Sequence, residues 1–81
     1  MDFKVGSLIE VIKGKDKGQL FIIKELTDKY AYLVNGSNRT LKMPKIKNLK
    51  HIKLKKIYNL DFKFMNDCDI IYRIKCFKRD L

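Results

Sequence analysis

Lysine side chains recur at intervals of one to three residues across positions 42–56, a spacing that suits the binding of polyanions. Between positions 29 and 60 the chain has nine basic residues and no acidic residue: Lys29, Arg39, Lys42, Lys45, Lys47, Lys50, Lys53, Lys55 and Lys56. Ammonium groups bind phosphate oxygens as point charges, and a region of one sign concentrates polyanions near it. This segment therefore favours a nucleic acid or an anionic membrane as partner.

The charge of the whole chain is unevenly distributed. The net charge is +10, yet residues 1–28 carry five lysines and five acids, which cancel. Residues 61–81 carry five basic and four acidic residues, so they add only +1. A generally basic composition does not by itself remove every carboxylate from one long segment. The 81 residues are enough for one domain with one modest core.

A second basic group lies on a short loop with glycine at both ends. Lys15, Asp16 and Lys17 stand between Gly14 and Gly18, and Lys13 precedes them. Loop lysines and free backbone N–H groups can hold phosphates, although a solvated hairpin tip has the same composition. We expect Gly18 to serve the backbone conformation rather than to make a contact.

Other candidates are single residues. Arg39 suits a bidentate phosphate or guanine contact, or a plain turn position. Tyr30 and Tyr32 alternate on one face and suit base stacking or ordinary packing. His51 is the only histidine, and Cys68 and Cys76 stand about 12 Å apart if they lie on one helix. We expect reduced thiols, no metal, no cofactor and no enzyme activity.

The elements that position these residues are mostly strands. Apolar, β-branched runs predict strands over residues 5–13, 19–26 and 30–34. Asn35 and Gly36 predict a type I′ hairpin turn, followed by a fourth strand over residues 39–43 that ends before Pro44.

After Pro44 two patterns compete. Ile46, Leu49 and Ile52 are spaced by three, whereas residues 52–55 alternate with period two. We predict a helical turn over residues 45–48 and a fifth strand over residues 50–55. If Ile52 and Leu54 face the core, the outer surface of that strand carries His51, Lys53 and Lys55, extended by Lys42, Lys45, Lys47 and Lys50. The alternative is a basic amphipathic helix over residues 45–60 on an anionic membrane.

The C-terminal part predicts a connector over residues 58–66 and an amphipathic helix over residues 68–79. Asn66 or Asp67 is a suitable N-cap, and Ile70, Ile74 and Phe77 share one face. The helix could cover the sheet or meet a partner.

A family likeness covers about residues 4–57. The stretch V-I-K-G-K-D-K-G-Q-L-F-I-I resembles a KOW motif, a strand–loop–strand unit with a central glycine, here Gly18. The stretch R-T-L-K-M-P-K-I-K-N-L-K-H-I-K-L resembles the basic strand after the hairpin in the archaeal and eukaryotic large-subunit ribosomal protein numbered fourteen. Small bacterial KOW proteins are similar in layout. The resemblance implies an SH3-like barrel of about five strands over residues 1–57, followed by the connector and helix over residues 58–81.

The resemblance also implies a function: RNA binding, with ribosomal RNA as the expected target. The expected contacts are Lys13, Lys15, Lys17, Gly18, Arg39, Lys42, Lys45, Lys47, Lys50, His51, Lys53, Lys55 and Lys56. The alternative is a protein-interaction module on transcription or ribosome machinery. We expect a cytoplasmic protein with no membrane segment and no small-molecule substrate, because no apolar run is long enough to span a bilayer.

Overall fold

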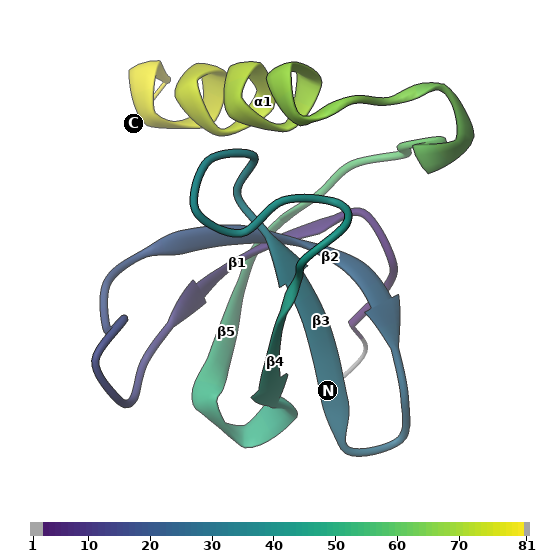
Figure 1. Ribbon diagram of the computed structural model, residues 1–81. Helices are drawn as coiled ribbons and strands as arrows, with labels where there is room; N and C mark the ends of the chain where they lie inside the picture. Colours follow the sequence, from purple (N-terminus) through teal and green to yellow (C-terminus); the bar gives the residue numbers. More distant parts are fainter. Residues whose placement is uncertain (1–2, 81) are drawn as a thin grey trace.

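The computed structural model describes residues 3–80, which form one antiparallel sheet of five strands and one long helix (Figure 1). The strands are β1 (Ser7–Val11), β2 (Leu20–Leu26), β3 (Tyr30–Val34), β4 (Lys45–Asn48) and β5 (Ile52–Ile57). Two short 3₁₀ helices, η1 (Leu49–His51) and η2 (Phe62–Phe64), precede α1 (Asp67–Arg79). The predicted fold class, mainly β with a C-terminal helix, is confirmed.

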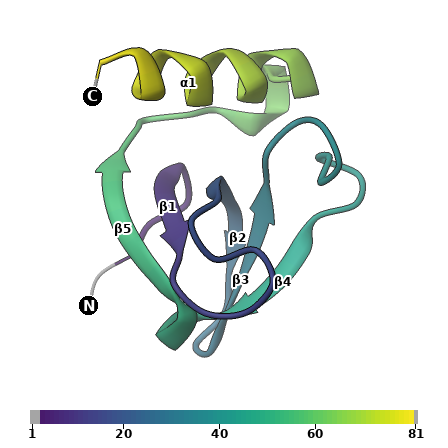
Figure 2. The ribbon, with the colours of Figure 1, turned by 90° about the vertical axis from the view of Figure 1, so that its left-hand side faces the viewer.

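The order of the strands explains why the sheet is curled. Neighbouring strands pair in the order β4-β3-β2-β1-β5, so β4 and β5 are the two edges. In the chain, however, only the three residues of η1 separate these edges. A link this short spans at most about 14 Å. The sheet must therefore bend until its two edges approach each other at the η1 end, as Figure 2 shows.

Consecutive apolar residues in the strands fill two cores, one on each face of the sheet. Alternate residues of a strand point to opposite faces, so a run such as Ile22–Ile23 is buried on both sides. The inner face carries Ile9, Val11, Phe21, Ile23, Ala31, Leu33 and Ile52. The outer face carries Leu8, Ile22 and Val34, which pack against Ile70 and Ile74 of α1.

The C-terminal helix begins where the sequence predicts. Asn66 is its N-cap, and the Asn66 side chain accepts a hydrogen bond from the Asp69 backbone N–H at 3.0 Å. The Asp69 carboxylate in turn accepts from the Asn66 N–H at 2.9 Å, which completes a capping box. Ile70 and Ile74 are buried, so α1 covers the part of the outer face that carries Leu8, Ile22 and Val34.

The predicted fourth strand is wrong. Residues 39–43 belong to a loop, and the strand that pairs with β3 is β4, over residues for which we predicted a helical turn. The type I′ turn is also wrong, because Asn35 does not have a positive φ. Its side chain instead accepts from the N–H groups of Ser37 and Arg39, both at 3.0 Å, and so organises a longer loop.

The alternative of a basic amphipathic helix over residues 45–60 on a membrane is also wrong. Residues 45–57 form β4, η1 and β5, and strand pairing to β3 and β1 accounts for both β segments. Within residues 3–80, no helix combines the length and apolar character needed to cross a membrane.

Candidate nucleic-acid interface

The loop between β1 and β2 is held tightly by its own backbone. Gly18 N–H donates to the Val11 carbonyl at 2.8 Å, and Gln19 N–H donates to the Asp16 carbonyl at 2.9 Å. Gly18 has a φ of +92°, and a Cβ added there would meet no atom within 4 Å. Gly18 therefore serves the backbone conformation, as the sequence predicts. The exposed lysines of the loop are Lys13, Lys15 and Lys17.

This loop reaches across the gap between the two edges of the curled sheet and meets β4 (Figure 2). The Asp16 carboxylate forms an ion pair with the Lys45 ammonium. The Lys47 Nζ lies so close to Gly14 that a Cβ on that glycine would stand 2.8 Å from it. Two basic segments that are distant in sequence thus become one surface.

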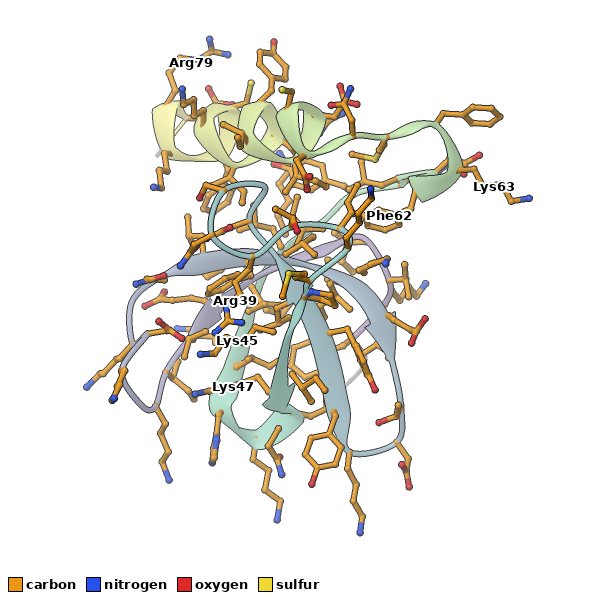
Figure 3. The ribbon with its side chains drawn as sticks, in the orientation of Figure 1. Arg39, Lys45, Lys47, Phe62, Lys63 and Arg79 are labelled. Atoms are coloured by element: carbon orange, nitrogen blue, oxygen red, sulfur yellow. The ribbon has the colours of Figure 1, made fainter. Side chains whose placement is uncertain are left out.

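The Asp16 carboxylate contacts one cation, Lys45, and two more act on it through their charge. The pKa of Asp16 is lowered, first by the hydrogen bond from Lys45 and also by the charges of Lys45, Lys47 and Arg39, while desolvation acts in the opposite direction. Figure 3 shows Arg39, Lys45 and Lys47 near one another beside β4, away from Lys63. We call Arg39, Lys45 and Lys47 around Asp16 the Asp16 cluster. With three positive groups and one negative group it has an excess of two positive charges.

The two lysines of β4 do not extend the outer surface of β5, so the single lysine surface expected from the sequence is wrong. Lys45 pairs with Leu33 and Lys47 pairs with Ala31, and both partners belong to the inner core. Cross-strand partners share a face of the sheet. Lys45 and Lys47 therefore lie on the inner side, where the β1–β2 loop fills the space in front of them.

The lysines of β5 form a separate group on the outer face. Ile52 is buried and Leu54 packs against the inner core, as predicted, so Lys53 and Lys55 project outward. Lys53 pairs with Glu10 across the strands, and Lys55 Nζ lies 3.5 Å from a Glu10 carboxylate oxygen. The lysine-rich segment is therefore opposed by two acids, Asp16 and Glu10, which come from the first hairpin.

Lys56 lies beside an aromatic ring that the sequence did not single out. Its Nζ is 5.3 Å from the centroid of the Tyr58 ring, and the guanidinium of Arg73 in α1 is 5.0 Å from the same centroid. Both distances are within the cation–π range. Tyr58 thus holds one basic residue of the sheet and one of the helix near each other.

The remaining candidates are scattered. Lys42 is exposed in the loop before β4, and Lys50 is exposed on η1. His51 is half-buried, and its backbone carbonyl accepts from the Ile12 N–H at 2.8 Å. Tyr32 pairs with Ile46, so Tyr30, Tyr32 and Ile46 share the outer face of β3 and β4. The tyrosines are on the opposite side of the sheet from the Asp16 cluster.

Sequence reasoning missed Asp16, the residue at the centre of this cluster. The only available signal was its position as the one acid among three loop lysines. Its partner lies on another element, which a local pattern does not reveal.

Comparisons with protein-family models and with curated proteins each found no match for this chain. Within residues 3–80, no three His, Cys, Asp or Glu side chains gather as a metal site would require.

Proposed function

We propose that the protein binds RNA, with ribosomal RNA as its target, by neutralising phosphates along its basic loop and strands. The observation that carries this proposal is the Asp16 cluster, where the β1–β2 loop and β4 bring Arg39, Lys45 and Lys47 together. The exposed loop lysines extend this positive surface. A rigid surface with excess positive charge suits the sugar–phosphate backbone of a nucleic acid.

The proposed fold is a small SH3-like barrel of the KOW type. Two features support it: five antiparallel strands in the order β4-β3-β2-β1-β5, and an η1 link that draws the two edges together. The glycine-bounded loop between β1 and β2 is a third supporting feature, because the KOW motif that the sequence resembles is a strand–loop–strand unit.

Lysine dominates the proposed interface. Only three of the nineteen basic residues in the chain are arginines, and lysine binds phosphate as a point charge rather than reading base edges. Recognition should therefore follow the shape of the RNA backbone more than its sequence. If about six to eight phosphates are neutralised, log affinity falls against log salt with a slope of magnitude about 4 to 7.

A filter-binding titration at several salt concentrations tests this proposal. The substitution Lys15→Glu should weaken RNA binding without altering the circular dichroism spectrum. Lys63→Glu is the matched control, because Lys63 is exposed on η2 away from the Asp16 cluster (Figure 3). A slope near zero, or equal losses for the two variants, would contradict the proposal. Co-sedimentation with ribosomal subunits tests the ribosomal target.

A groove under α1 favours a second function, docking of another protein of the transcription or ribosome machinery. This groove of about 740 Å³ lies between α1, the start of β2 and the loop after β3. Its walls include Leu20, Ile71 and Phe77, and its charged residues are Lys55, Lys75, Lys78 and Glu10, which pairs with Lys55. An apolar floor with lysines around it suits an acidic segment of a partner. Co-purification of a partner that survives nuclease and high salt would favour this function.

A further inference from the structure

We infer that the Asp16 carboxylate occupies, in the free protein, the position that one RNA phosphate takes in the complex. This inference rests on the proposed RNA binding and adds a regulatory element to the same surface. Asp16 would act as an internal competitor that RNA must displace from Lys45.

The first support is the composition of the Asp16 cluster. One carboxylate contacts Lys45, while Lys47 and Arg39 contribute positive charge from nearby. Within residues 3–80, neither Lys47 nor Arg39 forms an ion pair of its own. Two positive charges therefore remain uncompensated around a position that already holds an anionic oxygen group.

The second support is that Asp16 can leave. The Asp16 and Lys45 side chains retain 21% and 20% of their accessible surface, so water and a ligand can reach the pair. Ion pairs with access to solvent contribute little to stability, because both partners are well hydrated when apart. Asp16 also sits on a loop whose backbone hydrogen bonds do not involve its carboxylate. The carboxylate can turn away while the loop keeps its shape.

The third support is chemical similarity. A carboxylate and a phosphate diester each present anionic oxygens that accept hydrogen bonds from ammonium and guanidinium groups. A phosphate that enters the cluster exchanges one ion pair for another, and it takes over the attraction of Lys47 and Arg39 that Asp16 has in the free protein. Once displaced, Asp16 repels the phosphate. It therefore lowers RNA affinity and prevents weak anions from occupying the cluster.

Two substitutions that break the same ion pair test the inference by the sign of their effects. If RNA displaces Asp16 from Lys45, Asp16→Asn removes the competing carboxylate, so RNA should bind about fivefold tighter in low salt. Lys45→Gln removes a phosphate contact, so RNA should bind weaker by a similar factor. If Asp16 only clamps the loop to β4, both substitutions loosen the loop and both weaken binding.

The salt dependence gives an independent measurement. In the native protein Lys45 is already neutralised by Asp16, so RNA binding releases no counterion there. Asp16→Asn should therefore increase the magnitude of the salt slope by about 0.7 to 0.9. Glu25→Gln is the matched control, since it removes one exposed acid of β2 outside the cluster. It should change neither the slope nor, beyond about twofold, the affinity.

Each outcome decides something. Tighter binding and a steeper slope for Asp16→Asn, with weaker binding for Lys45→Gln, support the displacement. Changes in the same direction for both variants overturn the displacement but do not contradict the proposed RNA binding. Failure of the native protein itself to bind RNA overturns the proposed function and this inference together. Should Asp16→Asn unfold, Asp16→Ser provides the same test with a smaller side chain.

Discussion

The Asp16 carboxylate pairs with the Lys45 ammonium and so joins the β1–β2 loop to the first residue of β4. Lys45 belongs to an edge strand, and its cross-strand partner Leu33 lies in the inner core, so the pair lies on the inner side of the sheet. It also places the loop lysines beside those of β4. The backbone hydrogen bonds of the loop hold its shape, and the ion pair joins it to an element that lies far apart in the chain.

The first prediction concerns the acid stability of this contact. The cations around Asp16 hold its pKa below the ordinary value of 3.8. A carboxyl group whose pKa is lowered by folding stabilises the protein above its ordinary pKa, and this contribution is lost as the pH falls through the folded value. Below about pH 4, the native protein should lose slightly more thermal stability than Asp16→Asn, because a solvent-accessible ion pair contributes little. Melting curves recorded down to pH 2, about two units lower, measure the difference. Parallel curves for the two proteins would argue against the contact.

The second prediction compares two glycines. Gly36 has a φ of +83°, and a Cβ there would collide with the Asp67 carbonyl oxygen and with the Ile71 side chain. Gly18 has a similar φ but open space around it. Gly18→Ala should cost about 1–2 kcal/mol from backbone strain alone. Gly36→Ala should cost clearly more, because the backbone of the loop or of α1 must also move. Urea denaturation of both variants gives the comparison, and equal losses would be inconsistent with the packing of this loop against α1.

The third prediction concerns the attachment of α1 to the sheet. Ile70 is fully buried against Leu8, Ile22 and Val34. Ile70→Ala should reduce the free energy of unfolding by about 2–5 kcal/mol, because it removes buried methyl groups and leaves a cavity. Tyr72→Ala is the control on the same helix, since Tyr72 is 63% exposed. It should change stability by no more than about 0.5 kcal/mol. Chemical denaturation measures both, and a small effect at Ile70 would show that α1 is not held by this face.

The fourth prediction separates the two basic surfaces. Lys55 is opposed by Glu10 at 3.5 Å, whereas Lys15 is exposed at the tip of the β1–β2 loop. Lys15→Gln should reduce the magnitude of the salt slope of RNA binding by about 0.7 to 0.9, as expected for one lost phosphate contact. Lys55→Gln should reduce it less, because Glu10 already neutralises part of that charge. A larger effect for Lys55→Gln would move the interface to the outer face of β5.

Strands whose residues are buried on both faces were the easiest elements to predict. β1, β2 and β3 are runs of apolar, mostly β-branched residues, and each lies within or at the ends of its predicted range. The helix was equally clear, because Asn66 caps it and Ile70 and Ile74 recur at helical spacing. These signals are local, so they can be recognised without knowledge of the rest of the chain.

β4 was missed because its pattern is the reverse of the usual one. Ile46 is 55% exposed, while Lys45 and Lys47 lie on the side of the sheet that carries the inner core. Pairing with β3 makes this segment a strand, and the β1–β2 loop with Asp16 accommodates its inward lysines. Apolar periodicity cannot report such an arrangement, because the partners that permit it come from another part of the chain.

The order of residues alone determined the β-rich class, the capped helix and the segregation of positive charge into residues 29–60, since each depends on neighbours along the chain. The tertiary structure decided which lysines act together. It brought Asp16 to Lys45, and the pairing of β1 with β5 brought Glu10 to Lys55. It also placed the lysines of β4 on the inner face of the sheet and Lys53 and Lys55 of β5 on the outer face. Electrostatic attraction depends on distance in space, and only the folded chain sets that distance.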